Sequence, residues 1–237
     1  MRFVVLLVIG FLVASVAWFG IEKTRTDSFL QPVPAISTST TQTSLTTDVP
    51  ATRTSDTPTS TSSTGSPTTS SIHQPISNAQ SRITKKPFGI FVTPQNSPVS
   101  PERFTGYHTG VDFETTPAEQ KTDVPIYAMC TGMLRMKKFA TGYGGVAVQN
   151  CKIDGKDVTI VYGHLRLTSI APKVGSTMEA GQKIGVLGTG FSKETDGERK
   201  HLHLGIHIGT TINIAGYVSN KKLLSQWMDG RTVLEKK

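Results

Sequence analysis

Cysteine and histidine are scarce in this chain of 237 residues. Two common metal-binding motifs that use them are missing, which excludes the corresponding kinds of zinc site. There are two cysteines and six histidines. The cysteines, Cys130 and Cys151, do not form a CxxC pair, which argues against a structural zinc site. The HExxH motif of helix-borne zinc proteases is also missing. Any metal site must therefore use another arrangement of ligands.

The chain also lacks a run of basic residues with interleaved aromatics, although its net charge is +8. We therefore expect no nucleic-acid partner. A diffuse positive charge suits anionic wall polymers or lipid headgroups equally well.

Charge is absent altogether from residues 3–21, which form a continuous apolar run. At ~1.5 Å per residue, a helix of this length crosses the core of a bilayer. We expect residues 1–21 to be a transmembrane anchor. The alternative is a cleaved signal peptide with Ser15, Val16 and Ala17 at its small-residue site. The apolar run continues past that site to Ile21, which favours the anchor.

Residues 22–83 have few apolar side chains, and 24 of the 35 residues 37–71 are Ser or Thr. Such a segment buries too little apolar surface to offset the entropy of ordering it. We expect a disordered stalk over residues 22–83, which as a flexible coil would span roughly 40–45 Å. His73 lies in this segment and is expected to be solvated.

Residues 84–237 have the composition of one folded domain. Short alternating or apolar runs predict strands over residues 124–129, 133–139, 146–151, 158–162, 184–187 and 201–208. Asp154-Gly155 predicts a hairpin turn. Ser219 could cap a short final helix that holds Leu223, Leu224, Trp227 and Met228, with Gly230 after it. The predicted fold class is mainly β, an antiparallel sandwich or barrel-like sheet with a short C-terminal helix.

Cys130 comes at the end of one predicted strand of this domain, and Cys151 comes at the end of the next strand but one. A Cys130–Cys151 disulfide would close a loop of about 20 residues, worth on the order of 3 kcal/mol in the chain-entropy model. Two buried thiols are the alternative, and the compartment decides between them. Outside the cytoplasm we expect the disulfide.

Five of the six histidines lie in three motifs, HTGVD, YGHL and HLHLGIH. Side chains two residues apart on a strand share a face, so the third motif can present its histidines together. A catalytic zinc needs three protein ligands and an open position. In HTGVD an imidazole and a carboxylate lie four residues apart, and Gly110 lets the backbone bend between them. His207 would lie roughly 13 Å from His203 along a strand, too far to share its metal.

The order of these motifs resembles the M23 zinc metallopeptidases of the LytM or lysostaphin type, which cut peptidoglycan peptides. The resemblance covers about residues 100–210 and includes the segments GYGGVAVQ and VGSTMEAGQKIGVLGTG. It implies that zinc is bound by His108, Asp112 and His203. It also implies that His201 and His164 are catalytic, as general base and as stabiliser of the oxyanion. The chain departs from the family at Lys200, where Pro is frequent, and at Gly205, where Glu is common.

The expected function is that of a zinc-dependent endopeptidase, which hydrolyses peptide bonds in peptidoglycan cross-links or stem peptides during cell-wall remodelling. The alternative is a zinc-containing but non-hydrolytic wall-binding module that positions or activates another hydrolase. With the anchor, we expect a single-pass protein of the cell membrane with an extracytoplasmic, monomeric peptidase domain.

Overall fold

The computed structural model describes residues 71–236, so the predicted anchor and most of the predicted stalk lie outside the described residues. Within residues 71–236, no helix has the length and apolar character needed to cross a bilayer.

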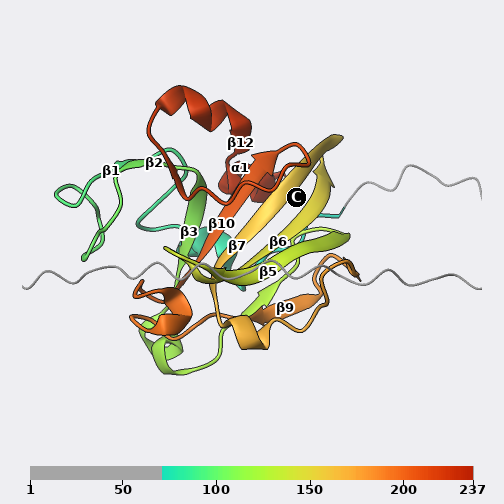
Figure 1. Ribbon diagram of the computed structural model, residues 1–237, viewed down its shortest axis with the longest axis horizontal. Coiled ribbons are helices and arrows are strands. Elements are labelled where there is room, and N and C mark those ends of the chain that lie inside the picture. Colours follow the sequence, from blue (N-terminus) through green and yellow to red (C-terminus); the bar gives the residue numbers. More distant parts are fainter. Residues whose placement is uncertain (1–70, 237) are drawn as a thin grey trace, which may run out of the picture. The chain divides into compact units, whose positions relative to one another are not determined.

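Seven strands of this part form one sheet, ordered β12–β10–β7–β6–β5–β8, with β3 also paired to β10. Figure 1 shows β5, β6, β7 and β10 side by side in the middle of the domain. The bounds are β3 Gly110–Glu114, β5 Gly132–Ala140, β6 Gly144–Ile153, β7 Lys156–Leu165, β8 Thr177–Met178, β10 His201–Ile208 and β12 Trp227–Met228. All pairs are antiparallel, which confirms the predicted class. In the described part of the chain the end strands β8 and β12 do not pair, so the sheet is not a closed barrel.

Two smaller sheets and several short helices complete the domain. One small sheet contains β1 Phe91–Val92, β2 Gly106–His108 and β11 Tyr217–Val218, and the other contains β4 Pro125–Tyr127 and β9 Lys183–Val186. The 3-10 helices are η1 Ala79–Arg82, η2 Pro117–Lys121, η3 Leu167–Ser169, η4 Lys193–Thr195 and η5 Lys221–Gln226, and the α-helix is α1 Gly230–Glu235.

The predicted hairpin joins β6 to β7. Asp154 and Gly155 have φ angles of 49° and 75°, as a tight hairpin turn with two left-handed residues requires. Ile153 pairs with Lys156 directly across the turn. The hairpin therefore sets the register of the two longest strands.

The central strands have two different faces. On β10, Leu202, Leu204 and Ile206 belong to the main hydrophobic core, as do Val111 and Phe113 of β3. Because side chains alternate along a strand, the residues between them lie on the other face. His201, His203 and Asp112 are therefore presented together on the face opposite the core.

The C-terminal helix is present but lies later in the chain than the pattern predicted. Asn220, rather than Ser219, accepts a hydrogen bond from the Lys222 amide at the start of η5. The chain then leaves the helical conformation, because Trp227 pairs with His207 on β10. The α-helix begins only at Gly230, and Asp229 caps it.

The predicted stalk boundary at residue 83 is wrong for residues 72–83. Ile76, Ala79 and Ile83 are buried in the main hydrophobic core. His73 is half-buried rather than solvated, and its ring packs on Tyr127 with centroids 5.9 Å apart. The low apolar content of this segment predicted disorder. Its few apolar residues are nevertheless buried, because they pack into the core of the domain.

A disulfide joins Cys130 to Cys151, with Cα atoms 6.2 Å apart. Cys151 lies on β6 and Cys130 lies just before β5, which pairs with β6. The predicted pairing is therefore confirmed.

Candidate metal centre

Asp112 and His203 face each other because of the register between β3 and β10. They are directly paired residues of these antiparallel strands. The Nδ1 atom of His203 lies 3.2 Å from Oδ1 of Asp112. Two residues that are 91 positions apart in sequence thus meet side by side.

His108 reaches the same point from β2. Its Nδ1 atom lies 3.2 Å from the Pro87 carbonyl oxygen, and because a carbonyl only accepts, this nitrogen is the N–H donor. Its Nε2 atom is then left facing His203 Nδ1 at 3.0 Å and Asp112 Oδ1 at 3.2 Å. A hydrogen bond from the second ring nitrogen commonly orients a metal-binding histidine in this way.

The three atoms have the chemistry and the spacing of a metal site. His108, Asp112 and His203 are only 1%, 2% and 3% exposed, and together they form a group able to hold a metal ion. Ligands at about 2.0–2.1 Å from a tetrahedral zinc lie about 3.4 Å apart, close to the spacing found here. Two imidazoles and one carboxylate supply three ligands and leave a fourth position for water. The residues therefore fit the predicted ion.

His201 lies on the same face of β10, next to this cluster. Its Nδ1 atom donates to the Arg199 carbonyl oxygen at 2.9 Å, so Nε2 is the nitrogen directed into the site. Nε2 lies 3.3 Å from Oδ2 of Asp112. His201 thus contacts the oxygen of Asp112 that does not face His108 and His203.

His164, near the end of β7, packs against His201 with ring centroids 4.2 Å apart. Its φ of 62° lies in the left-handed region, which costs a non-glycine residue about 1–3 kcal/mol and is found most often at functional sites. Its buried Nδ1 atom has no hydrogen-bond partner within residues 71–236. The strain and the unpaired nitrogen both indicate a role other than packing.

Burial and mutual contact shift the titration of these groups. Burial lowers the pKa of His164 well below its usual value, and the neighbouring His201 lowers it further. Burial also lowers the pKa of His203 to about 4. Burial alone would raise the pKa of Asp112, but His201 and His108 outweigh it and hold that pKa well below the usual value. At neutral pH His164 and His203 are therefore neutral imidazoles beside the ionised carboxylate of Asp112.

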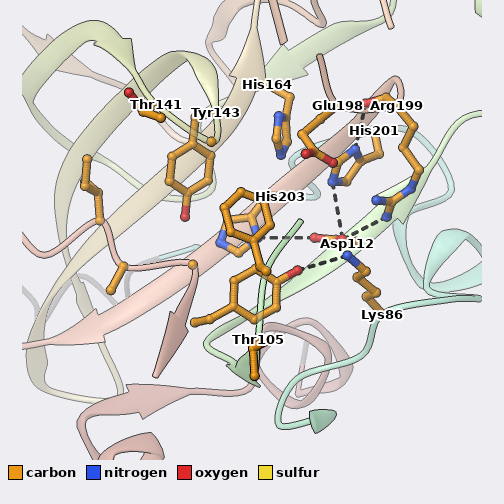
Figure 2. A pocket seen from close by; sticks show the side chains of 16 residues that line it. Lys86, Thr105, Asp112, Thr141, Tyr143, His164, Glu198, Arg199, His201 and His203 are labelled. Atoms are coloured by element: carbon orange, nitrogen blue, oxygen red, sulfur yellow. Dashed lines mark hydrogen bonds and ion pairs between the residues drawn. The ribbon is translucent and has the colours of Figure 1, made fainter. Parts of the chain in front are cut away.

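Asp112, His164, His201 and His203 line a cavity of about 430 Å³. Figure 2 shows Tyr143 on one side of His203 and Lys86 on the other, with His164 beside His201. Lys86 donates to the Tyr217 hydroxyl at 2.9 Å and forms a buried ion pair with Glu102. The cavity gives a ligand access to the cluster from one side.

Arg199 contacts the proposed metal ligand Asp112, and the sequence pattern did not reveal this contact. Its Nη2 atom lies 2.8 Å from Oδ2 of Asp112 and 2.6 Å from Oε1 of Glu114. The only available signal was that Asp112 and Glu114 share a face of one strand while Arg199 precedes another. The contact between Arg199 and these two carboxylates could not be predicted from the sequence, because it depends on the register between β3 and β10.

The two departures from the family pattern have different structural effects. Lys200 is buried and donates to the Thr122 carbonyl oxygen at 2.6 Å. A Cβ atom at Gly205 would lie 3.2 Å from Trp227 and 3.4 Å from Nε2 of His203. The glycine therefore leaves room for the indole beside the His203 ring.

His207 does not join the cluster, as the distance along the strand predicted. Its ring packs on Trp227, with centroids 4.9 Å apart.

Comparison with known proteins finds one matching family and several similar solved structures. A profile described as peptidase family M23 matches residues 106–214. No curated protein matches the sequence. Among solved structures, lysostaphin is 26% identical, with 55% of this chain and 44% of that chain covered and a TM-score of 0.40. LytU is 25% identical (63% and 91% covered, TM-score 0.40), and CbpA from L. salivarius REN is 21% identical (64% and 84% covered, TM-score 0.42). Less than half of the lysostaphin chain is therefore spanned, while the profile match contains all five site residues.

Proposed function

Residues 106–214 belong to peptidase family M23, and from this we propose that the domain is a zinc-dependent endopeptidase that hydrolyses peptide bonds of peptidoglycan. The observation that carries the proposal is the convergence of His108, Asp112 and His203 at mutual distances of 3.0–3.2 Å, next to a cavity that Asp112 and His203 line.

The ion proposed for this cluster is zinc, held by His108 Nε2, Asp112 Oδ1 and His203 Nδ1. Bound there, zinc would polarise the carbonyl of the scissile peptide bond and lower the pKa of water at the open position. The chain itself must then move a proton and stabilise the negative charge that develops on the carbonyl oxygen.

His201 is proposed as the general base. Its Nε2 atom is directed into the site because Nδ1 donates to the Arg199 carbonyl oxygen. A proton taken up at Nε2 is stabilised by the carboxylate of Asp112 at 3.3 Å. The same proton can later pass to the leaving amine.

His164 is proposed as the donor to the developing oxyanion. Burial keeps its imidazole neutral at neutral pH, because it lowers the pKa well below the usual value. A neutral imidazole carries one N–H donor. Since His164 is held beside His201 at a centroid distance of 4.2 Å, both histidines can act on one peptide group.

The substrate class follows from the resemblance of the motifs to LytM- and lysostaphin-type peptidases. The net charge of +8 suits an anionic wall polymer. We also propose that the apolar run over residues 3–21 anchors the chain in the cell membrane and that the domain acts outside the cytoplasm as a monomer.

The test uses the full-length chain and purified sacculi, and it measures the release of peptide ends. We expect activity that a zinc chelator abolishes and that added zinc restores, and we expect none from His203→Ala. His207→Ala is the matched control, because His207 lies on the same face of the same strand but outside the cluster. Activity that survives both chelation and His203→Ala would refute the proposal.

His164→Ala separates a hydrolase from a non-hydrolytic module. A hydrolase should lose turnover while the variant still binds zinc. If neither the wild type nor the variant cleaves sacculi but both stimulate a partner hydrolase, the domain is the non-hydrolytic module instead.

A further inference from the structure

The carboxylate of Asp112 uses its two oxygens for different contacts. Oδ1 faces His108 and His203, at 3.2 Å from each. Oδ2 faces away from them, toward Arg199 at 2.8 Å and His201 at 3.3 Å. The carboxylate is therefore held in one rotation, with a single oxygen available to the cluster (Figure 2).

Arg199 is itself held in place without Asp112. Its Nε and Nη2 atoms lie 2.6–3.2 Å from the carboxylate oxygens of Glu114, which is two residues after Asp112 on the same face of β3. The Arg199 side chain is 11% exposed, so water competes little for these contacts. The planar guanidinium presents its donors in a fixed geometry that a lysine does not share.

The backbone of the same residue orients His201. The Arg199 carbonyl oxygen accepts the hydrogen bond from His201 Nδ1 at 2.9 Å. One residue thus contacts the second oxygen of a metal ligand through its side chain and a catalytic histidine through its backbone.

We propose that Arg199 is a positioning residue of the metal centre, which occupies Oδ2 of Asp112 so that this carboxylate supplies one ligand atom and the fourth position stays open. The inference rests on the proposed function. Glu114 offsets the positive charge of Arg199, so the pair changes the orientation of Asp112 with little change in the net charge near the ion. An unheld carboxylate could turn both oxygens toward the ion and fill the open position.

The test uses two variants of the full-length chain that keep the net charge of the Arg199–Glu114 pair at zero. Arg199→Lys keeps the positive charge but loses the rigid fork, and the double variant Arg199→Gln/Glu114→Gln removes both charges together. Zinc affinity is measured by competition with a chromophoric chelator. The visible absorption of the Co²⁺ form reports the number of ligand atoms. Arg103→Lys is the matched control, because Arg103 pairs with Glu198 and does not contact Asp112.

We expect both variants to bind zinc 10–100-fold more weakly than the wild type, as is typical when a partner of a metal ligand is lost. Their Co²⁺ spectra should also change, while Arg103→Lys should match the wild type in both measurements. Thermal unfolding of the metal-free proteins shows which variants are folded. If the double variant does not fold, Arg199→Lys alone tests the inference.

Folded variants with wild-type affinity and wild-type Co²⁺ spectra would overturn the inference and leave the proposed function intact. A wild type that binds no zinc would instead refute the proposed function, and the inference with it.

Discussion

Gly110 lies between two of the proposed metal ligands, and its replacement by alanine gives a sharp test of how the site is built. Gly110 does not adopt a positive φ, so the bend in the backbone that the sequence suggested is not what requires a glycine. A glycine is required because there is no space for a side chain. A Cβ atom at this position would lie 2.5 Å from the Leu204 carbonyl oxygen and 2.8 Å from Cε1 and Nε2 of His203.

These contacts leave the methyl group of Gly110→Ala two ways to fit. Either β3 moves away from β10, or the His203 ring turns. Both movements separate Asp112 Oδ1 from His203 Nδ1, which now lie 3.2 Å apart. Overpacking of this kind costs about 1–3 kcal/mol, which for a domain of this size lowers the melting temperature by roughly 2–12 °C. A displaced ligand should weaken zinc binding by at least about 10-fold.

The assays are thermal unfolding of the metal-free protein and zinc competition with a chelator. Gly185→Ala is the matched control. Gly185 lies on β9, where its Cβ atom would meet Ser169 Oγ at 2.8 Å, and it does not line the cavity. We expect it to lose stability and to keep its zinc affinity. The reasoning fails if Gly110→Ala binds zinc like the wild type, or if Gly185→Ala loses as much affinity.

Three further predictions concern stability. Replacing Cys130 and Cys151 together with alanine removes a cross-link between residues 21 positions apart. This should cost about 3 kcal/mol and lower the melting temperature by roughly 6–12 °C. An unchanged melting temperature would contradict it. A chain that starts at residue 84 lacks the buried Ile76 and Ile83, so in urea it should be about 3–6 kcal/mol less stable than one that starts at residue 71. Equal unfolding midpoints would place residues 71–83 outside the cooperative fold. In metal-free protein, burial lowers the pKa of His203 from 6.5 to about 4. Between these pH values the unfolded state binds a proton that the folded state does not, so stability should fall by up to about 3 kcal/mol as pH drops from 6.5 to 4. Urea unfolding over this pH range in the presence of a chelator measures the effect, and a flat profile would show that the imidazole is not buried as described.

Local patterns predicted most of the strands and the site residues, because both depend on contacts close in sequence. The alternation in residues 201–208 places His201 and His203 on one face whatever lies beside that strand. Asp154-Gly155 specifies the β6–β7 turn through its own backbone preferences.

The errors arose where a distant partner overrides a local signal. Trp227 and Met228 fit a helical pattern, yet they pair with β10 as a short strand. Ile76 and Ile83 lie among polar residues, yet the sheet buries them. In both cases the burial gained from a remote strand exceeds what the local composition could indicate.

By itself the sequence determined which residue types could hold a metal and which of them share a strand face, since side-chain direction repeats every two residues. Only the tertiary structure decided that Asp112 lies opposite His203, that His108 reaches both, and that Arg199 holds the second oxygen of Asp112. Strand register depends on pairing between segments about 90 residues apart, which no short pattern encodes.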